Sequence, residues 1–201
     1  MTSEFVLPEG AQLSVICYLD STPRTFHSEV EKGRPLTLKC NAEWCGMLDK
    51  GARAMLVYQE GDSIQKAETT VRARTQRDDS WVLQLGEPKW ELVDQRRHPR
   101  HPAELLAQVR IVSEQDGSPV FETQSCKTVD LSLGGCWIAT TSLPAQGALI
   151  EVQLHLSYFG TIRAMGVVAW SDANRGGFGV EFLDYIGSAR YYLHQFLQRA
   201  A

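Results

Sequence analysis

The chain has 201 residues, of which 43% are hydrophobic and 22% charged, a composition that is ordinary for a soluble globular protein. This length suffices for two small domains or one medium domain. The formal net charge of −4 argues against a protein whose whole surface coats nucleic acid. The N-terminal segment lacks the features of a signal peptide, and no run approaches the roughly 18 apolar residues of a membrane span, so we expect a cytoplasmic protein without a transmembrane segment.

The five cysteines do not form a recognisable disulfide framework. In a chain without a leader we expect them to be reduced, buried thiols. Cys40 and Cys45 could suggest zinc, but no second Cys or His pair follows at the spacing of a zinc finger. We therefore expect neither a metal ion nor a resident cofactor.

The first half of the chain has the pattern of an antiparallel β domain. Apolar or alternating runs are separated by turns rich in Gly and Asp, as in a small β sandwich or barrel. Strands are expected within residues 12–20, 25–40 with a turn at 32–33, 51–75 with a turn at 60–62, and 78–88.

The second half continues this pattern and then changes period. Six strands are expected, within residues 103–112, 120–132, 135–142, 148–156, 160–171 and 176–184. A closed or half-closed antiparallel barrel suits six strands, because closure removes exposed edges. Apolar residues then recur at helical spacing and predict an amphipathic helix over 185–199 that covers the barrel; binding of a partner is the alternative role. The residues of this stripe are Ala189, Tyr192, Leu193, Phe196 and Leu197.

The fold class is therefore mainly all-β, with two small β-barrel domains in tandem at residues 1–94 and 95–201. Charge is unevenly spread between them, because residues 1–95 contain 11 basic and 15 acidic residues and residues 96–201 contain 9 of each. The most basic short stretch, QRRHPRHP at residues 95–102, falls on the boundary. We expect it to join the two domains.

This boundary segment contains an arginine pair with the spacing RxxxR. Pro99 disfavours a helix and extends the chain, so Arg96, Arg97 and Arg100 project from an extended arm. The planar fork of arginine can bind a phosphate or the O6/N7 edge of guanine with two hydrogen bonds, and its flat face can stack on a base. A solvated basic linker is the alternative interpretation.

A second short motif, DLSLGG, follows at residues 130–135, at the end of an expected strand. Asp130 and Ser132 are suited to bond the backbone of a turn, and Gly134 and Gly135 allow close approach of another group. Asp130 could instead accept hydrogen bonds from the N1–H and N2–H₂ groups of a guanine. Taken alone, the motif is equally consistent with an ordinary turn between strands.

Together, the RxxxR arm and the DxSxxG turn resemble the PilZ domain family, bacterial receptors for cyclic di-GMP. The resemblance covers about residues 95–200, including the segments RRHPRHPAELLAQVRI, DLSLGGCWI and VVAWSDANRGGFGVEF. The first half resembles, in pattern and position, the N-terminal β domain that precedes PilZ in flagellar-brake-like proteins.

The resemblance implies a role for each motif residue. Arg96 and Arg100 would bind phosphate and the Hoogsteen edge of guanine, and Arg97 would add a contact or turn outward. Ligand binding would fix the arm and change the arrangement of the two domains. Gln95 would influence whether one ligand or a stacked pair binds, and Trp170 is either a stacking platform or a residue of the barrel core. The resemblance also implicates four residues on the barrel, namely Asp130, Ser132, Gly134 and Gly135.

The resemblance also implies an effector that regulates motility, biofilm or exopolysaccharide output. Its partner would be a protein such as the flagellar motor or the polysaccharide synthesis machinery, with a second copy of the chain as a further partner. A PilZ-like module that binds proteins but no nucleotide is the alternative, although both motifs are complete here. We expect no enzyme, because the sequence has no P-loop, Gly-x-Ser-x-Gly or His-Glu-x-x-His motif. Nucleic acid is not an expected partner, since three arginines on an acidic chain form a weak footprint.

Overall fold

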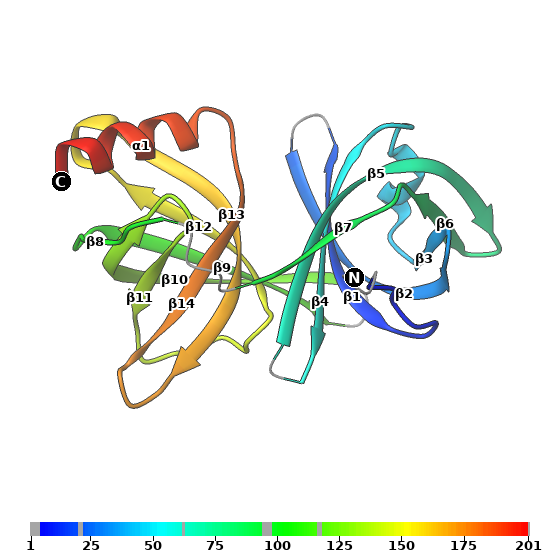
Figure 1. Cartoon of the computed structure of the whole chain (residues 1–201), viewed down its shortest axis with the longest axis horizontal. Helices are drawn as coiled ribbons and strands as arrows, with labels where there is room; N and C mark the ends of the chain where they lie inside the picture. Colours follow the sequence, from blue (N-terminus) through cyan, green and yellow to red (C-terminus); the bar gives the residue numbers. More distant parts are fainter. Residues whose placement is uncertain (1–4, 20–21, 62, 94–97, 116–117, 201) are drawn as a thin grey trace. The chain divides into compact units, whose positions relative to one another are not determined.

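The computed structural model describes residues 5–19, 22–61, 63–93, 98–115 and 118–200. The chain divides into two compact units, the first of Met1–Val93 with Glu114–Pro119 and the second of Asp94–Ser113 with Val120–Ala201. Each unit contains a closed β barrel of six strands, and Figure 1 shows the two barrels in the colours of the sequence. The predicted fold class, mainly β with two barrels, is therefore confirmed.

The barrel of the first unit closes through pairing of β4 with β5. The order around it is β4-β1-β2-β3-β6-β5, and β7 adds to the outer side of β5. Alternation explains these strands, because Phe26, Ser28 and Val30 of β2 point inward while their neighbours face outward. The elements are β1 (Gln12–Leu19), β2 (Thr22–Gly33), β3 (Leu36–Cys40), the 3₁₀ helix η1 (Glu43–Met47), β4 (Arg53–Glu60), β5 (Ser63–Arg77), β6 (Ser80–Leu85) and β7 (Lys89–Leu92).

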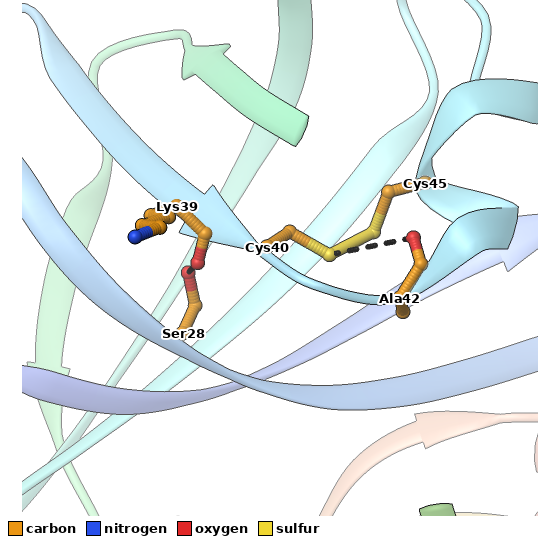
Figure 2. Close-up of a disulfide and its surroundings, with 5 residues drawn as sticks. All are labelled: Ser28, Lys39, Cys40, Ala42 and Cys45. Atoms are coloured by element: carbon orange, nitrogen blue, oxygen red, sulfur yellow. Dashed lines mark hydrogen bonds between the residues drawn. A yellow bond between two sulfur atoms is a disulfide. The ribbon is translucent and has the colours of Figure 1, made fainter. Parts of the chain in front are cut away.

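Two of the five cysteines are joined, which corrects the expectation of five reduced thiols. Cys40 ends β3, and η1 turns the chain back so that Cys45 forms a disulfide with it (Figure 2). The other cysteines are free; burial raises the pKa of the Cys17 thiol to about 12 and that of Cys126 to about 11. Cys136 is buried as well. The five-residue spacing was a sign of proximity that sequence reasoning did not use.

The barrel of the second unit closes through pairing of β11 with β10. Its order is β11-β14-β13-β12-β9-β10, and the short strand β8 adds to β10. The elements are β8 (His101–Pro102), β9 (Leu106–Gln115), β10 (Ser118–Ser132), β11 (Gly135–Ala139), β12 (Leu149–His155), the 3₁₀ helix η2 (Ser157–Phe159), β13 (Thr161–Asp172), β14 (Gly177–Tyr185) and the helix α1 (Ala189–Ala200).

The helix α1 packs on this second barrel, as predicted from its apolar stripe (Figure 1). Ala189, Leu193 and Leu197 are buried in the same core cluster as the inward residues of the strands. Tyr192 is an exception to the prediction, because its side chain is 41% exposed. The buried stripe is therefore the i, i+4, i+8 row alone, with Phe196 partly buried beside it.

Candidate functional site

The RxxxR arm and the DxSxxG strand meet through an ion pair. The Arg100 Nη1 atom lies 2.9 Å from Asp130 Oδ1, and the two side chains are 25% and 32% exposed. Directly after Arg100, β8 pairs with β10, with Pro102 opposite Asp130 and His101 opposite Leu131. This pairing holds the end of the arm beside Asp130 independently of the ion pair, so the two predicted motifs are brought together.

A β-bulge sets the direction of the Asp130 side chain. Thr128 and Leu131 are both buried, which strict alternation along β10 would not allow. The register between β10 and β11 shifts between Thr128 and Asp130, so one extra residue stands in β10 and Asp130 faces the outside of the barrel. There its Oδ1 atom also accepts a hydrogen bond from the backbone N–H of Trp137, at 3.2 Å.

Ser132 builds the turn that follows. Its buried hydroxyl donates to the Gly135 carbonyl oxygen and accepts from the Gly134 N–H, both at 3.2 Å. Two residues of β14 also hold this turn. The Phe182 N–H group donates to the Gly134 carbonyl oxygen at 2.9 Å, and the hydroxyl of Tyr185, the last residue of the strand, donates to the Leu133 carbonyl oxygen at 2.5 Å. Burial raises the pKa of this tyrosine, which keeps its hydroxyl protonated as a donor. Ser132 thus has a structural role in the turn.

The two glycines of the motif have different surroundings. A Cβ atom on Gly135 would lie 2.0 Å from the Val180 carbonyl oxygen of β14, so this residue must be glycine for the strands to pair. Among the described residues, a Cβ atom on Gly134 would meet the His98 ring at 3.2 Å and the Ser132 hydroxyl at 3.9 Å. Gly134 is therefore the glycine that faces the arm, and His98 lies against it.

Asp130 begins a row of residues that crosses four strands on the outer face of the barrel. Asp130 of β10 is opposite Trp137 of β11, which is opposite Gly179 of β14, which is opposite Trp170 of β13. The two indole rings contact each other over the glycine, with centroids 4.0 Å apart. A Cβ atom on Gly179 would come within 2.4 Å of the Trp170 Nε1 atom, so the glycine makes room for the rings.

The interpretation of Trp170 as a core residue is wrong. Val168 lies in the core, and alternation would point Trp170 inward as well. A register shift between Val168 and Trp170 adds one residue to β13 and turns the indole to the outer face, where it is only partly buried.

Sequence reasoning missed two residues of this region. Trp137, only 5% exposed, lies between the core residues Cys136 and Ile138, so alternation alone could have placed it on the outer face beside Asp130. Arg175 lies in the turn between β13 and β14, and its guanidinium carbon is 4.8 Å from the centroid of the Trp137 ring and 5.8 Å from that of Trp170. No pattern in the sequence connects this arginine with the tryptophans.

Three of the predicted site residues, Gln95, Arg96 and Arg97, lie outside the described residues. In the part of the chain that the structure describes, no group of three or more His, Cys, Asp or Glu side chains could hold a metal ion. No helix among those residues is long and apolar enough to span a membrane.

Comparison with known families identifies the second unit. The family model described as the PilZ domain matches residues 94–199, more than half of the chain. The chain belongs to the PilZ domain family. The match includes the arm, the turn, the row of outer-face residues and most of α1.

Several solved structures are similar to this PilZ chain at low sequence identity. The Bacillus subtilis inhibitor of motility MotI/DgrA shares 12% identity over 96% of this chain and 97% of its own, with a TM-score of 0.40. MrkH of K. pneumonia in complex with c-di-GMP shares 13% identity over 92% and 86%, with a TM-score of 0.37. YcgR from Escherichia coli in complex with c-di-GMP shares 14% identity over 93% and 81%, with a TM-score of 0.36. No curated protein sequence matches the chain.

Proposed function

We propose that this PilZ chain is a cyclic di-GMP receptor and not an enzyme. The observation that carries the proposal is the 2.9 Å ion pair between Arg100 of the arm and Asp130 of the barrel. It supports a site in which guanidinium and carboxylate groups act on one ligand that has both hydrogen-bond acceptors and donors. Cyclic di-GMP has both, because its two phosphates and the Hoogsteen edges of its guanines accept hydrogen bonds and the Watson–Crick edges donate them.

The geometry of Asp130 supports binding of a guanine by its carboxylate. The hydrogen bonds from Arg100 and from the backbone of Trp137 both end on Oδ1. Among the residues that the structure describes, Oδ2 has no such partner. We propose that Oδ2 accepts from the N1–H or N2–H₂ group of one guanine. Carboxylates that accept charge-assisted hydrogen bonds bind more strongly than neutral acceptors do.

The other motif residues divide into contact and support positions in this proposal. Arg100, together with Arg96 and Arg97, binds phosphate and a guanine Hoogsteen edge, and Gly134 allows the ligand to approach the backbone. Ser132 and Gly135 maintain the turn that presents these groups, and Gln95 influences whether one ligand or a stacked pair binds. Trp170, on the outer face of the barrel, offers an aromatic surface for stacking.

The consequence of binding would lie in the arrangement of the two units. We propose that residues 1–94 form the N-terminal β domain of a flagellar-brake-like protein and residues 95–201 its PilZ domain. Ordering the arm costs conformational entropy, which charge-assisted bonds to a dianionic ligand offset. The new arrangement would regulate motility, biofilm or exopolysaccharide output through a protein partner.

Isothermal titration with cyclic di-GMP, with GTP as the control ligand, tests the proposal. The wild type should bind the cyclic dinucleotide and not GTP, and Arg100→Ala should lower affinity about tenfold or more because a charge-assisted contact is lost. Lys127→Ala is the matched control, since it removes another exposed cation of the second unit, one that is ion-paired to Glu104. A wild type that binds no cyclic di-GMP would refute the proposal and leave the alternative of a PilZ module that binds only proteins.

A further inference from the structure

A second arginine, Arg175, lies over the two tryptophans of the row that starts at Asp130. Its guanidinium carbon is 4.8 Å from the centroid of the Trp137 ring and 5.8 Å from that of Trp170, within the range of cation–π contact. Its side chain is exposed. Within the described part of the chain, it has neither a carboxylate partner nor a side-chain hydrogen bond.

The turn that carries Arg175 is built to hold it in place. Asp172 Oδ1 accepts hydrogen bonds from the backbone N–H groups of Asn174 and Arg175, at 2.9 and 3.1 Å. Gly176 then takes a positive φ of 64°, which lets the chain return directly into β14. The backbone of Arg175 is thus fixed by the turn while its side chain lies on the indoles, and contacts that restrain a side chain before binding lower the entropy cost of binding.

An arginine held in this way has unused hydrogen-bond donors. A guanidinium over aromatic rings contacts them with its face, and its N–H groups point outward in its own plane. Two donors on one edge match two neighbouring acceptors, such as the O6 and N7 atoms of guanine or two oxygens of a phosphate. The structure provides no such acceptors for Arg175 among the described residues.

Arg100 contacts Asp130 at one end of the row, and Arg175 lies over the two tryptophans that follow it. From Asp130 on β10 to Trp170 on β13 the row crosses three strand spacings, or about 14 Å at the usual distance between strands. A ligand with a single phosphate group would need only one of the two arginines. A cyclic dinucleotide carries two phosphates and two bases and has acceptors for both.

We propose that Arg175 is a further ligand-contact residue, which binds a guanine Hoogsteen edge or a phosphate of the dinucleotide whose other end is held by Arg100 and Asp130. This inference rests on the proposed function. Trp137 acts as a positioning residue in it, because it is nearly buried and supports the guanidinium from below.

Titration of the full chain with cyclic di-GMP tests this assignment. Arg175→Ala should lower affinity about 5- to 150-fold, the discrimination supplied by one good bidentate contact. Arg175→Met keeps a long side chain on the indoles without the guanidinium and should lose as much, whereas Arg175→Lys should lose less because it keeps the charge. Arg199→Ala is the matched control, since Arg199 is also exposed and lies 5.0 Å from the Phe159 ring centroid, away from the row.

Competition with cyclic di-AMP distinguishes the two kinds of acceptor. This analogue keeps both phosphates but lacks the guanine O6 atoms. An effect of Arg175→Ala on cyclic di-GMP alone assigns the residue to the guanine edge, and an equal effect on both ligands assigns it to phosphate. If Arg175→Ala and Arg175→Met bind like wild type while Arg100→Ala is weak, the inference is wrong and the proposed function stands. If the wild type itself does not bind, the proposed function fails.

Discussion

The two adjacent glycines of the DxSxxG turn should respond in opposite ways to alanine. At Gly135 the new Cβ atom would lie 2.0 Å from a carbonyl oxygen of β14, and contacts below 3.0 Å essentially never occur, so β11 and β14 must separate by about 1 Å. Overpacking of this kind costs about 1–3 kcal/mol, and each ladder hydrogen bond lost adds about 1 kcal/mol. We expect Gly135→Ala to lower the free energy of unfolding of the second barrel by about 2–4 kcal/mol.

The assay is thermal and urea denaturation of the full chain, with hydrogen exchange of peptides from β11 and β14 as the local measurement. A loss of about 2 kcal/mol corresponds to a fall in the melting temperature of about 8–16 °C for a barrel of this size. Gly134→Ala is the matched control and should stay within about 0.5 kcal/mol of wild type, because among the described residues the nearest atom to the new Cβ atom belongs to the His98 ring, at 3.2 Å. Equal stability of the two variants would refute the steric reasoning.

Three further predictions concern charge and sulfur chemistry. Asp130→Asn removes a charge from a partly exposed ion pair and keeps an acceptor for the backbone N–H of Trp137. The free energy of unfolding should therefore fall by less than about 1 kcal/mol in urea denaturation, while the affinity for cyclic di-GMP should fall at least about tenfold by titration. Burial raises the pKa of Glu151, but the hydrogen bond and the charge of Arg163 outweigh this effect and hold the pKa below 4.5. The stability that this ion pair contributes is present above pH 4.5 and is lost as the pH falls through the lowered pKa. Arg163→Gln should flatten this acid dependence in denaturation curves recorded from about pH 6 to about pH 3. Reduction of the Cys40–Cys45 disulfide should lower the free energy of unfolding of the first barrel by about 2 kcal/mol, the value that chain entropy gives for so short a loop. As the control, dithiothreitol should leave the stability of a Cys40→Ser/Cys45→Ser variant unchanged.

Hydrophobic alternation and turn residues were sufficient to predict the larger elements. The expected strand at 135–142 corresponds to β11, and that at 176–184 to β14. In both strands the residues of the core cluster recur at every second position, namely Cys136 and Ile138 in β11 and Phe178, Val180 and Phe182 in β14. The elements that were missed are short, namely η1, β7, β8 and η2. The strands β7 and β8 and the 3₁₀ helix η2 span two to four residues, too few to establish a period, and η1 completes less than two turns. The two residues of β8 are assigned to a strand through their pairing with β10.

The site was harder to predict than the fold because two β-bulges decide its direction. Asp130 and Trp170 each follow a one-residue shift in register, and each therefore faces the outer surface although alternation would place it in the core. Each bulge lies between two consecutive strands, β10 with β11 and β13 with β14, and it is seen only in the register of their pairing, which the pattern of one strand does not contain. The motif residues could be found by resemblance to the PilZ family, and alternation could have placed Trp137 on the outer face, whereas Arg175 is identified only by its contacts with the two indole rings.

The register also gives β14 a central place in the site. Val180 of this strand excludes any side chain at position 135, Phe182 binds the turn through its backbone, and Gly179 makes room for the paired indoles. The strand β14 therefore pairs on its two sides with β11 and β13, which carry the two tryptophans, and holds the turn after Asp130 through the Phe182 N–H group. A shift of β14 would move both ends together, since neighbouring strands are held by continuous ladders. If a dinucleotide spans the row, its affinity should then depend on the packing of β14 as well as on the residues that touch the ligand. In the proposed site, Ser132 and Gly135 would thus support affinity through the turn and β14, without contacting the ligand.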